Sequence, residues 1–282
     1  MKNKELFKIF EKQQISYRIV PILIIIICIL VSPALVLADD PEARKIMEQV
    51  DARDDGDNQV SDMEMILIDK NSNQRVRRIR SFNKDNGKDE LRLMFFLSPA
   101  DVENTAFLTW DYDQADMDDD QWLYLPAVGK PKRIAASDKD ASFMGSDFYY
   151  GDITDLELTL YDFKILKETK VGDYPAFLIE SIPSTQKTID DYGYTKSILY
   201  VRKDIYMVVR AVHFLKEQGK LKYLDVTQLD KIEGIWVATE LQMWTVKGKM
   251  KQHHTIIKLS NVKFNQPLEE NFFTVRQMQK GL

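Results

Sequence analysis

Cysteine is almost absent from the chain: the single residue, Cys28, lies inside a long apolar run near the start of the 282 residues. Ile27 precedes it, whereas lipid attachment to a cysteine requires a small residue at that place. Residues 39–282 contain no cysteine, which excludes a disulfide framework for this part of the chain, even in an oxidising compartment. Its stability must come from core packing, and its length is sufficient for one all-β domain.

Histidine is also scarce, with only His213, His253 and His254. The adjacent pair points to opposite faces of a predicted strand, and His213 stands among apolar residues, as a structural histidine does. The sequence has no His/Cys cluster with zinc spacing, no glycine-rich phosphate loop after a strand and no Gly-x-Ser-x-Gly turn. We therefore predict no metal site, no cofactor and no enzyme activity.

Positive charge is in deficit over most of the chain. The total is −5, and residues 1–38 hold five basic and two acidic residues, so residues 39–282 carry −8. No block of five or more basic residues occurs there. This charge excludes nucleic acid as a partner and opposes adhesion to anionic head groups as the main mode of action.

The first 38 residues have the pattern of a secretory signal peptide. Basic residues from Lys2 to Arg18 precede an apolar run over 19–37, which ends at Val36-Leu37-Ala38 before Asp39. We predict cleavage after Ala38 and a periplasmic location. The alternative is a retained membrane anchor, because the run approaches the roughly 20 residues that a spanning helix needs. Pro21, Ser32 and Pro33 favour the signal peptide.

The remaining sequence is mainly β in pattern. Asp40 and Pro41 introduce one amphipathic helix over 41–50, and period-2 alternation begins at Gln59. Asn86-Gly87 predicts a hairpin. Two short strands with long loops are expected over 98–155, and regular strands over 163–170, 176–182, 196–202, 207–215, 222–229, 235–246 and 253–264. We predict a single domain, 39–282, in which about ten antiparallel strands form a large curved sheet or incomplete barrel with one or two helices.

Two features between Ser98 and Asp155 invite a functional interpretation. An acidic loop contains Asp111, Asp113, Asp116, Asp118, Asp119 and Asp120, but its spacing matches no calcium loop, so we interpret it as solvated. Aromatic and methionine side chains are also abundant. They are equally consistent with an ordinary core and with an apolar cavity, which a curved sheet too large to fill its own concavity leaves behind.

Four motifs in this region resemble the outer membrane lipoprotein-sorting protein family, whose fold is LolA-like. They are Phe96-Leu97-Ser98-Pro99-Ala100-Asp101-Val102, Thr105-Ala106-Phe107-Leu108, Asp120-Gln121-Trp122-Leu123-Tyr124-Leu125-Pro126-Ala127 and Ser142-Phe143-Met144-Gly145-Ser146-Asp147-Phe148. Phe272-Phe273-Thr274-Val275-Arg276 is similar to the family's closing segment. After Pro126 the chain departs from the pattern, because Val128-Gly129-Lys130-Pro131-Lys132-Arg133 stands where a basic run is common.

The resemblance implies an open antiparallel half-barrel covered by a few helices, with an apolar concave side that accommodates acyl chains. It implies a carrier of a lipid or an acylated lipoprotein between an inner-membrane exporter of the RND or MMPL type and the outer membrane. The alternative is a non-catalytic adaptor of such a transporter that carries no lipid. The predicted cavity or gate residues are Trp110, Trp122, Leu123, Leu125, Phe143, Met144 and Phe148. Lys130, Lys132 and Arg133 are candidate head-group contacts or solvated cations.

Overall fold

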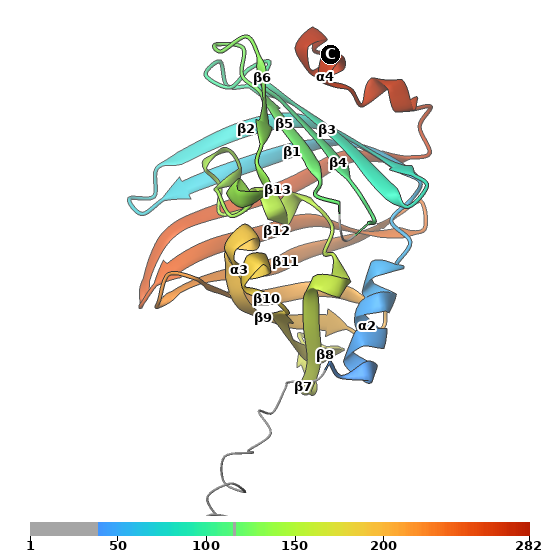
Figure 1. The fold of residues 1–282 in the computed structure, drawn as a ribbon, viewed down its shortest axis with the longest axis vertical. Coiled ribbons are helices and arrows are strands. Elements are labelled where there is room, and N and C mark those ends of the chain that lie inside the picture. The colour runs from blue at the N-terminus through green and yellow to red at the C-terminus, as the bar shows by residue number, and fades with distance from the viewer. Residues whose placement is uncertain (1–38, 115–116) are drawn as a thin grey trace, which may run out of the picture. The chain divides into compact units, whose positions relative to one another are not determined.

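A computed structural model describes residues 39–114 and 117–282, and one antiparallel sheet of thirteen strands dominates it (Figure 1). The strand order is β6-β5-β4-β3-β2-β1-β13-β12-β11-β10-β9-β8-β7, so β6 and β7 are the two edges and the sheet is not closed into a barrel. The predicted signal peptide, 1–38, lies outside the described residues. Within the described ranges, no helix is both long and apolar enough to cross a membrane.

The elements follow the predicted alternation closely. The strands are β1 (Asn58–Asp69), β2 (Gln74–Asn86), β3 (Asp89–Ser98), β4 (Ala106–Asp111), β5 (Asp120–Tyr124), β6 (Pro131–Ile134), β7 (Tyr161–Val171), β8 (Tyr174–Pro183), β9 (Tyr194–Arg202), β10 (Met207–Leu215), β11 (Lys220–Ile232), β12 (Ile235–Lys247) and β13 (Met250–Phe264). The helices are α2 (Pro41–Asp51), α3 (Gln186–Tyr192) and α4 (Val275–Lys280). Short 3-10 turns are η1 (Ala136–Asp138), η2 (Phe143–Gly145), η3 (Tyr150–Ile153), η4 (Leu158–Leu160) and η5 (Glu270–Phe272).

The mainly β fold and the open curved sheet predicted from the sequence are confirmed. The helix α2 begins where predicted, because the Asp40 side chain accepts the backbone N–H groups of Glu42 and Ala43. The predicted hairpin joins β2 to β3. Asn86 pairs with Asp89, so the loop is Gly87-Lys88, and Gly87 supplies the positive φ of 75° that this tight turn requires.

The sheet has an inner, concave face and an outer face, and alternate residues of each strand divide between them. On β3, Leu93 and Phe95 pack on the outer face with Phe273 and Met278, which α4 and the preceding turn contribute. Met94 and Phe96, from the same strand, pack on the inner face. Figure 1 shows the sheet curving around α3 and the chain between β6 and β7, while α4 lies on the other side of β3, β4 and β5.

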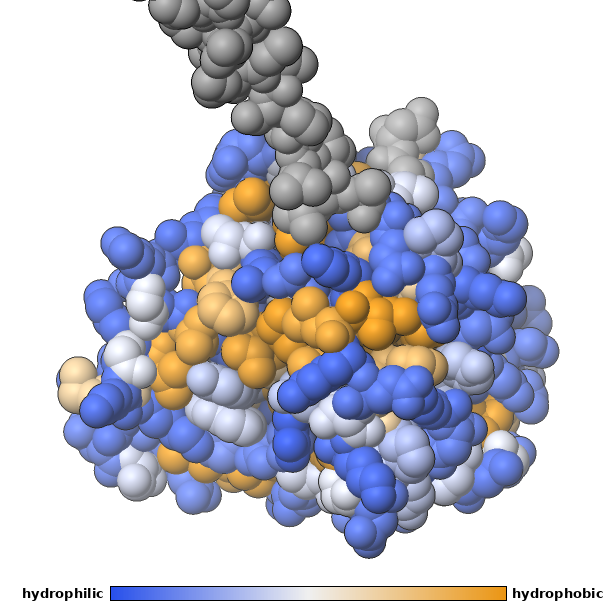
Figure 2. All heavy atoms as spheres, turned by 90° about the horizontal axis from the view of Figure 1, so that it is seen from below, coloured by the Kyte–Doolittle hydropathy of each residue, from blue (hydrophilic) through white to orange (hydrophobic). Residues whose placement is uncertain are grey.

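Farther along the sheet, the outer face carries a row of half-buried apolar and aromatic side chains on five neighbouring strands, β9 to β13. The row consists of Ile198, Val212, Tyr223, Trp244 and His254. Figure 2 views the molecule from the β7 and β8 end and shows hydrophobic residues gathered in a band with hydrophilic residues on both sides.

The first residues of the described unit cover the start of the edge strand β7, from Tyr161 to Ile165. The backbone N–H of Asp40 donates to the carbonyl of Phe163 at 2.9 Å, and the Asp39 carboxylate accepts the Phe163 N–H at 2.8 Å. Arg44 donates to the carbonyls of Leu158 and Tyr161, at 2.6 Å each. These contacts satisfy backbone groups of the edge strand that would otherwise be open to another chain.

Candidate functional site

The chain between β6 and β7 fills the concave side of the sheet. We call residues 135–160, which contain η1 to η4, the inner segment. Its Phe143, Phe148, Tyr150 and Ile153 are buried in one cluster with inner side chains of the sheet. The sheet residues of this cluster are Met65, Leu67, Ile79, Met94, Phe96, Phe107, Ile134, Met243 and Ile257. The concave side of the sheet is therefore apolar, as the family resemblance implies, but the chain itself fills it, as in the alternative of an ordinary core.

Phe143 lies at the centre of this packing. Its side chain is 1% exposed, and its ring centroid lies 4.9 Å from that of Phe107, 5.7 Å from Tyr150 and 6.4 Å from Phe96. Such aromatic contacts add to the free energy gained by burial alone. The inner segment is thus held mainly by apolar packing on this half of the sheet.

The structure brings together four of the seven predicted cavity residues. Phe143 and Phe148 are buried in the inner cluster, and Leu123 and Met144 pack against it, half-buried. Leu125 is half-buried just beyond the end of β5.

The other two predicted residues, Trp110 and Trp122, lie on the outer face. Their rings meet edge to face at 5.8 Å, and the Trp110 indole N–H donates to the Phe273 carbonyl at 2.9 Å. Trp122 and Leu123 are neighbours on β5, so the alternation of a strand sends their side chains to opposite faces. The two tryptophans therefore do not share a cavity with Phe143.

The predicted head-group cations lie at the edge of the sheet. Lys130 precedes the edge strand β6, and Lys132 and Arg133 belong to it; all three are exposed. Arg133 forms an ion pair with Asp120 of the neighbouring strand β5. Exposed ion pairs of this kind contribute little to stability.

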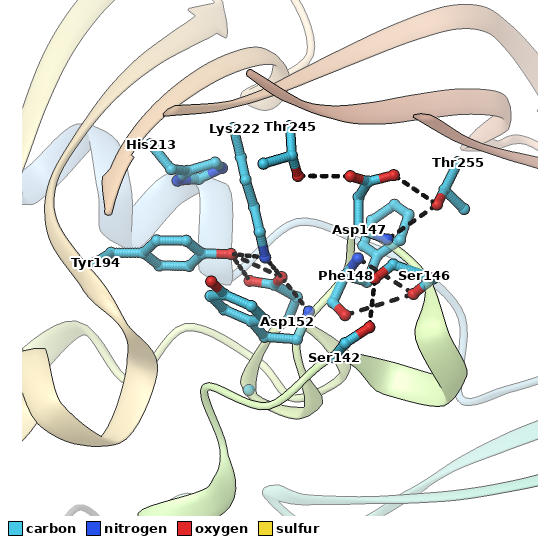
Figure 3. A network of polar contacts seen from close by, with 12 residues as sticks. Ser142, Ser146, Asp147, Phe148, Asp152, Tyr194, His213, Lys222, Thr245 and Thr255 are labelled. Atoms are coloured by element: carbon cyan, nitrogen blue, oxygen red, sulfur yellow. Dashed lines mark hydrogen bonds and ion pairs between the residues drawn. The ribbon is translucent and has the colours of Figure 1, made fainter. Parts of the chain in front are cut away.

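Asp147 ties the inner segment to β12 and β13 through a network of polar contacts (Figure 3). Its carboxylate accepts the hydroxyls of Thr245 at 2.5 Å and Thr255 at 2.8 Å, and it lies 2.7 Å from Nδ1 of His253. The Asp147 backbone N–H donates to the Thr255 hydroxyl at 2.9 Å. Because Asp147 is only 4% exposed, these partners compensate the cost of burying its carboxylate.

Lys222 forms a second buried contact with the inner segment. Its side chain is 2% exposed and extends from β11 toward Asp152, as Figure 3 shows. The ammonium lies 2.8 Å from the ring centroid of Tyr149, 3.2 Å from the Tyr194 hydroxyl and 3.7 Å from the Asp152 carboxylate. Burial lowers the pKa of Lys222 to about 8, although Asp152 and Asp147 favour the charged form.

Asp152 and His213 complete this network. The Tyr194 hydroxyl lies 2.8 Å from both Asp152 oxygens, and the Tyr149 backbone N–H donates to Asp152 at 2.7 Å. The His213 ring stacks on Tyr194 with centroids 4.6 Å apart, and its Nδ1 lies 2.8 Å from the Ser197 hydroxyl. Burial lowers the pKa of His213 to about 4, so the ring is neutral at pH 7.

The strand register explains why these polar groups meet. Ser197, His213, Lys222, Thr245 and His253 pair in sequence across β9, β10, β11, β12 and β13 and form one inner row, which we call the polar row. The next inner row on β9 to β12 is apolar and consists of Leu199, Ala211, Leu224 and Met243. A pocket of about 410 Å³ lies at the polar row, between the inner segment and the ends of these strands.

A larger groove, of about 1120 Å³, lies at the opposite ends of the strands and is acidic. Its lining includes Asp85, Glu90, Asp111, Asp119 and Asp155. Burial, with Asp119 and Asp155 nearby, raises the pKa of Asp111 to about 9. Asp119 is nearly buried and pairs with Lys139 at 2.8 Å. The interpretation of the acidic loop as simply solvated is therefore wrong for Asp111 and Asp119.

The sequence analysis named His213 and His253 but missed Ser197, Lys222 and Thr245 of the polar row and their partners Asp147 and Asp152. Their only local indication is that Lys222 alternates with Leu224 on one face of a strand, and that Asp147 interrupts an aromatic stretch. A lysine or aspartate in such a place is more often exposed. Only the long-range pairing of the inner segment with β11 to β13 reveals their burial.

Comparison with known proteins agrees with this architecture. A family model described as "Uncharacterized protein" matches residues 88–280. A structure of an outer membrane lipoprotein-sorting protein domain from Vibrio parahaemolyticus is 30% identical, with a TM-score of 0.77, over 84% of this chain and 98% of that one. The chain belongs to the outer membrane lipoprotein-sorting protein family. The family resemblance seen in the sequence motifs is thereby confirmed.

Two further structures place this lipoprotein-sorting family member among LolA-like folds. A DUF1329 family protein from Desulfovibrio piger ATCC 29098 is 28% identical, with a TM-score of 0.77, over 86% of this chain and 99% of that one. A LolA superfamily protein from Nitrosomonas europaea is 20% identical, with a TM-score of 0.62 and coverage of 82% and 97%, and supports the fold alone. No curated protein sequence matches the chain.

Proposed function

We propose that the protein is a non-catalytic carrier of a lipid, or of the acyl chains of a lipoprotein, on the concave side of its sheet. The observation that carries this proposal is that the apolar inner face of β1 to β4, β12 and β13 is covered by the inner segment, which consists of loops and short 3-10 turns, whereas α2 covers the inner face of β7 to β10. A segment of this kind can be displaced without breaking a strand pairing. The name of the Vibrio parahaemolyticus relative supports the same role.

The hydrophobic effect provides the driving force. Sheltering one methylene from water contributes about 0.8 kcal/mol, so a dozen methylenes contribute on the order of 10 kcal/mol. That is comparable to the stability of an entire domain, and we propose that it offsets the release of the inner segment. We propose Leu123, Phe143, Met144 and Phe148 as the side chains that line or gate the acyl-chain site. Trp110 and Trp122 lie outside this site because they face α4.

Native mass spectrometry of the protein purified from its own host tests the proposal. We expect a copurified lipid and, in a separate titration, uptake of a fluorescent fatty acid. A protein that carries no lipid and takes up no fatty acid would rule the carrier out.

We also propose that carriage takes place in the periplasm, after cleavage of residues 1–38, between an inner-membrane exporter of the RND or MMPL type and the outer membrane. The sequence pattern supports cleavage after Ala38. Mass spectrometry of the mature amino terminus tests it, with Asp39 as the expected first residue. A mature chain that still contains residues 1–38 would support the membrane-anchor alternative.

The filled interior favours one competing function, an adaptor of such an exporter that carries no lipid. In that case the region Ser98 to Asp155 forms a protein interface and the inner segment is a permanent part of the core. Crosslinking in the periplasm separates the two. If substitutions on this surface abolish lipid release but leave capture by the transporter intact, the adaptor function is excluded.

A further inference from the structure

The inner face of the sheet is polar at one end of its strands and apolar in the middle. On β11, Lys222 belongs to the polar row and Leu224 to the apolar one; on β12, Thr245 and Met243 are divided in the same way. This order, two residues apart on each strand, matches an amphiphile whose head group meets the polar row while its chain runs along the apolar row.

The two ends of the strands differ in charge. Strand β1 runs from Asn58, beside Lys84, to Asp69, beside His253. The first end holds the acidic groove, whose lining includes Asp85, and the second end holds the 410 Å³ pocket, whose lining includes His253. An anionic group is repelled by the first end, so the second is the place where it can bind.

The pocket has an excess of positive groups. Three lysines, Lys220, Lys222 and Lys247, line it against two acids, Asp147 and Glu217, and His253 adds a positive charge only when it is protonated. Both acids are already engaged: three side chains surround the Asp147 carboxylate, and Glu217 accepts Lys220 at 3.2 Å and Lys247 at 2.6 Å.

Lys222 has fewer hydrogen-bond acceptors in this pocket than its ammonium group can use. Within the described part of the chain, its ammonium makes one hydrogen bond, to the Tyr194 hydroxyl, although an ammonium can donate three. The Asp152 carboxylate is 3.7 Å away and is held instead by Tyr194 and the Tyr149 backbone. A buried cation of this kind gains strongly from an anionic oxygen brought into contact with it.

We propose that this pocket binds the anionic group, a carboxylate or a phosphate, of an amphiphile, with Lys222 as its buried counter-ion and the acyl chain along the apolar row. The inference rests on the proposed function as a carrier, and it assigns the head group to β11 and β12 and not to Lys130, Lys132 and Arg133 at the β6 edge. The pocket is too small for a whole lipid, so the chain must extend past Leu224 and Met243 into the space that the inner segment occupies, because α2 covers Leu199 and Ala211 at the other end of the row.

Binding titrations with dodecanoate, dodecanol and inorganic phosphate test the proposal. Dodecanoate and dodecanol share one chain length and differ in charge, so their ratio isolates the head group. We expect the wild type to bind dodecanoate at least about tenfold more tightly than dodecanol. Lys222→Met should abolish this preference. Lys164→Met, which removes an exposed cation from β7, and Lys132→Met should both retain it.

Equal binding of dodecanoate and dodecanol by the wild type overturns the head-group site but leaves the carrier function standing. Binding of neither amphiphile overturns both, and Lys222-dependent binding of phosphate alone then identifies a site for the free anion. Loss of the preference in Lys132→Met, with Lys222→Met unaffected, moves the site to the β6 edge. Because Lys222→Met leaves Asp152 without its cation, the double variant Lys222→Met/Asp152→Asn is measured alongside it, and both are checked by thermal unfolding. A folded double variant that retains the preference also overturns the proposal.

Discussion

Replacement of Phe143 by alanine tests whether the inner segment competes with a ligand for the concave face. The ring is 1% exposed and contacts the rings of Phe96, Phe107 and Tyr150. Truncation of a fully buried phenylalanine costs about 3–5 kcal/mol when the surroundings cannot collapse. This loss falls only on the state in which the inner segment is packed against the sheet. If a ligand must displace that segment, about half of the loss returns as affinity, because the ligand also loses contact with the Phe143 ring.

Each 1.4 kcal/mol corresponds to about a factor of ten, so we expect Phe143→Ala to bind a fluorescent fatty acid between about tenfold and a hundredfold more tightly than the wild type. The matched control is Phe273→Ala. Phe273 is equally buried, at 0% exposure, but packs on the outer face against β3 and β4. It should lower the free energy of urea unfolding by a similar amount without changing fatty-acid affinity.

Fatty-acid affinity and unfolding free energy together show whether the ligand displaces the inner segment. Unchanged or weaker fatty-acid binding in Phe143→Ala, with the expected loss of stability, would falsify displacement of the inner segment by the ligand. A similar gain of affinity in both variants would show instead that general destabilisation, and not release of the segment, admits the ligand.

Three further changes test the polar contacts. Arg44→Ala should lower the free energy of unfolding by about 2–4 kcal/mol, because it removes two 2.6 Å hydrogen bonds, one to Leu158 of η4 and one to Tyr161 at the start of β7. Arg44→Lys should recover less than half of this loss, and a loss under about 0.5 kcal/mol for Arg44→Ala in urea titrations contradicts the prediction. The pKa of His213 is lowered to about 4, so the unfolded state takes up a proton first, and the free energy of unfolding falls by up to about 3 kcal/mol as the pH drops from 6.5 to 4. His213→Gln should flatten this pH dependence. A variant with the same pH dependence as the wild type argues against a neutral buried ring. The pKa of Asp111 is raised to about 9, so the free energy of unfolding falls as the pH rises from 4 to 9. Asp111→Asn should therefore be more stable than the wild type at pH 8 by at least about 1 kcal/mol. A variant that unfolds at a lower temperature than the wild type contradicts this prediction.

Local patterns in the sequence predict the framework of this fold well. Asp40 and Pro41 specify the start of α2, and the alternation after Gln59 specifies the strands, because both depend on neighbouring residues. The short edge strand β6 was not predicted. Its four residues begin with Pro131 and include two exposed cations, so they offer no alternation to detect.

The candidate site is harder to predict from the sequence than the fold is. Alternation already requires Trp122 and Leu123 to face opposite sides, but it does not tell which side is concave. The curvature of thirteen strands and the position of α4 decide that. Lys222 is buried because Tyr149 and Asp152, from a distant segment, pack over it, and no pattern within β11 records that contact.

The covered start of β7 has a consequence for whether a second copy of the chain can add a strand to the sheet. An open sheet of this size has two borders at which a second copy could add its own strand. One border, β6, is short and begins with a proline that cannot donate a hydrogen bond; the other depends on Asp39, Asp40 and Arg44. A protease that trims only a few residues from the start of the folded unit would therefore uncover β7 and convert the protein into a species that self-associates, with its sheet otherwise intact.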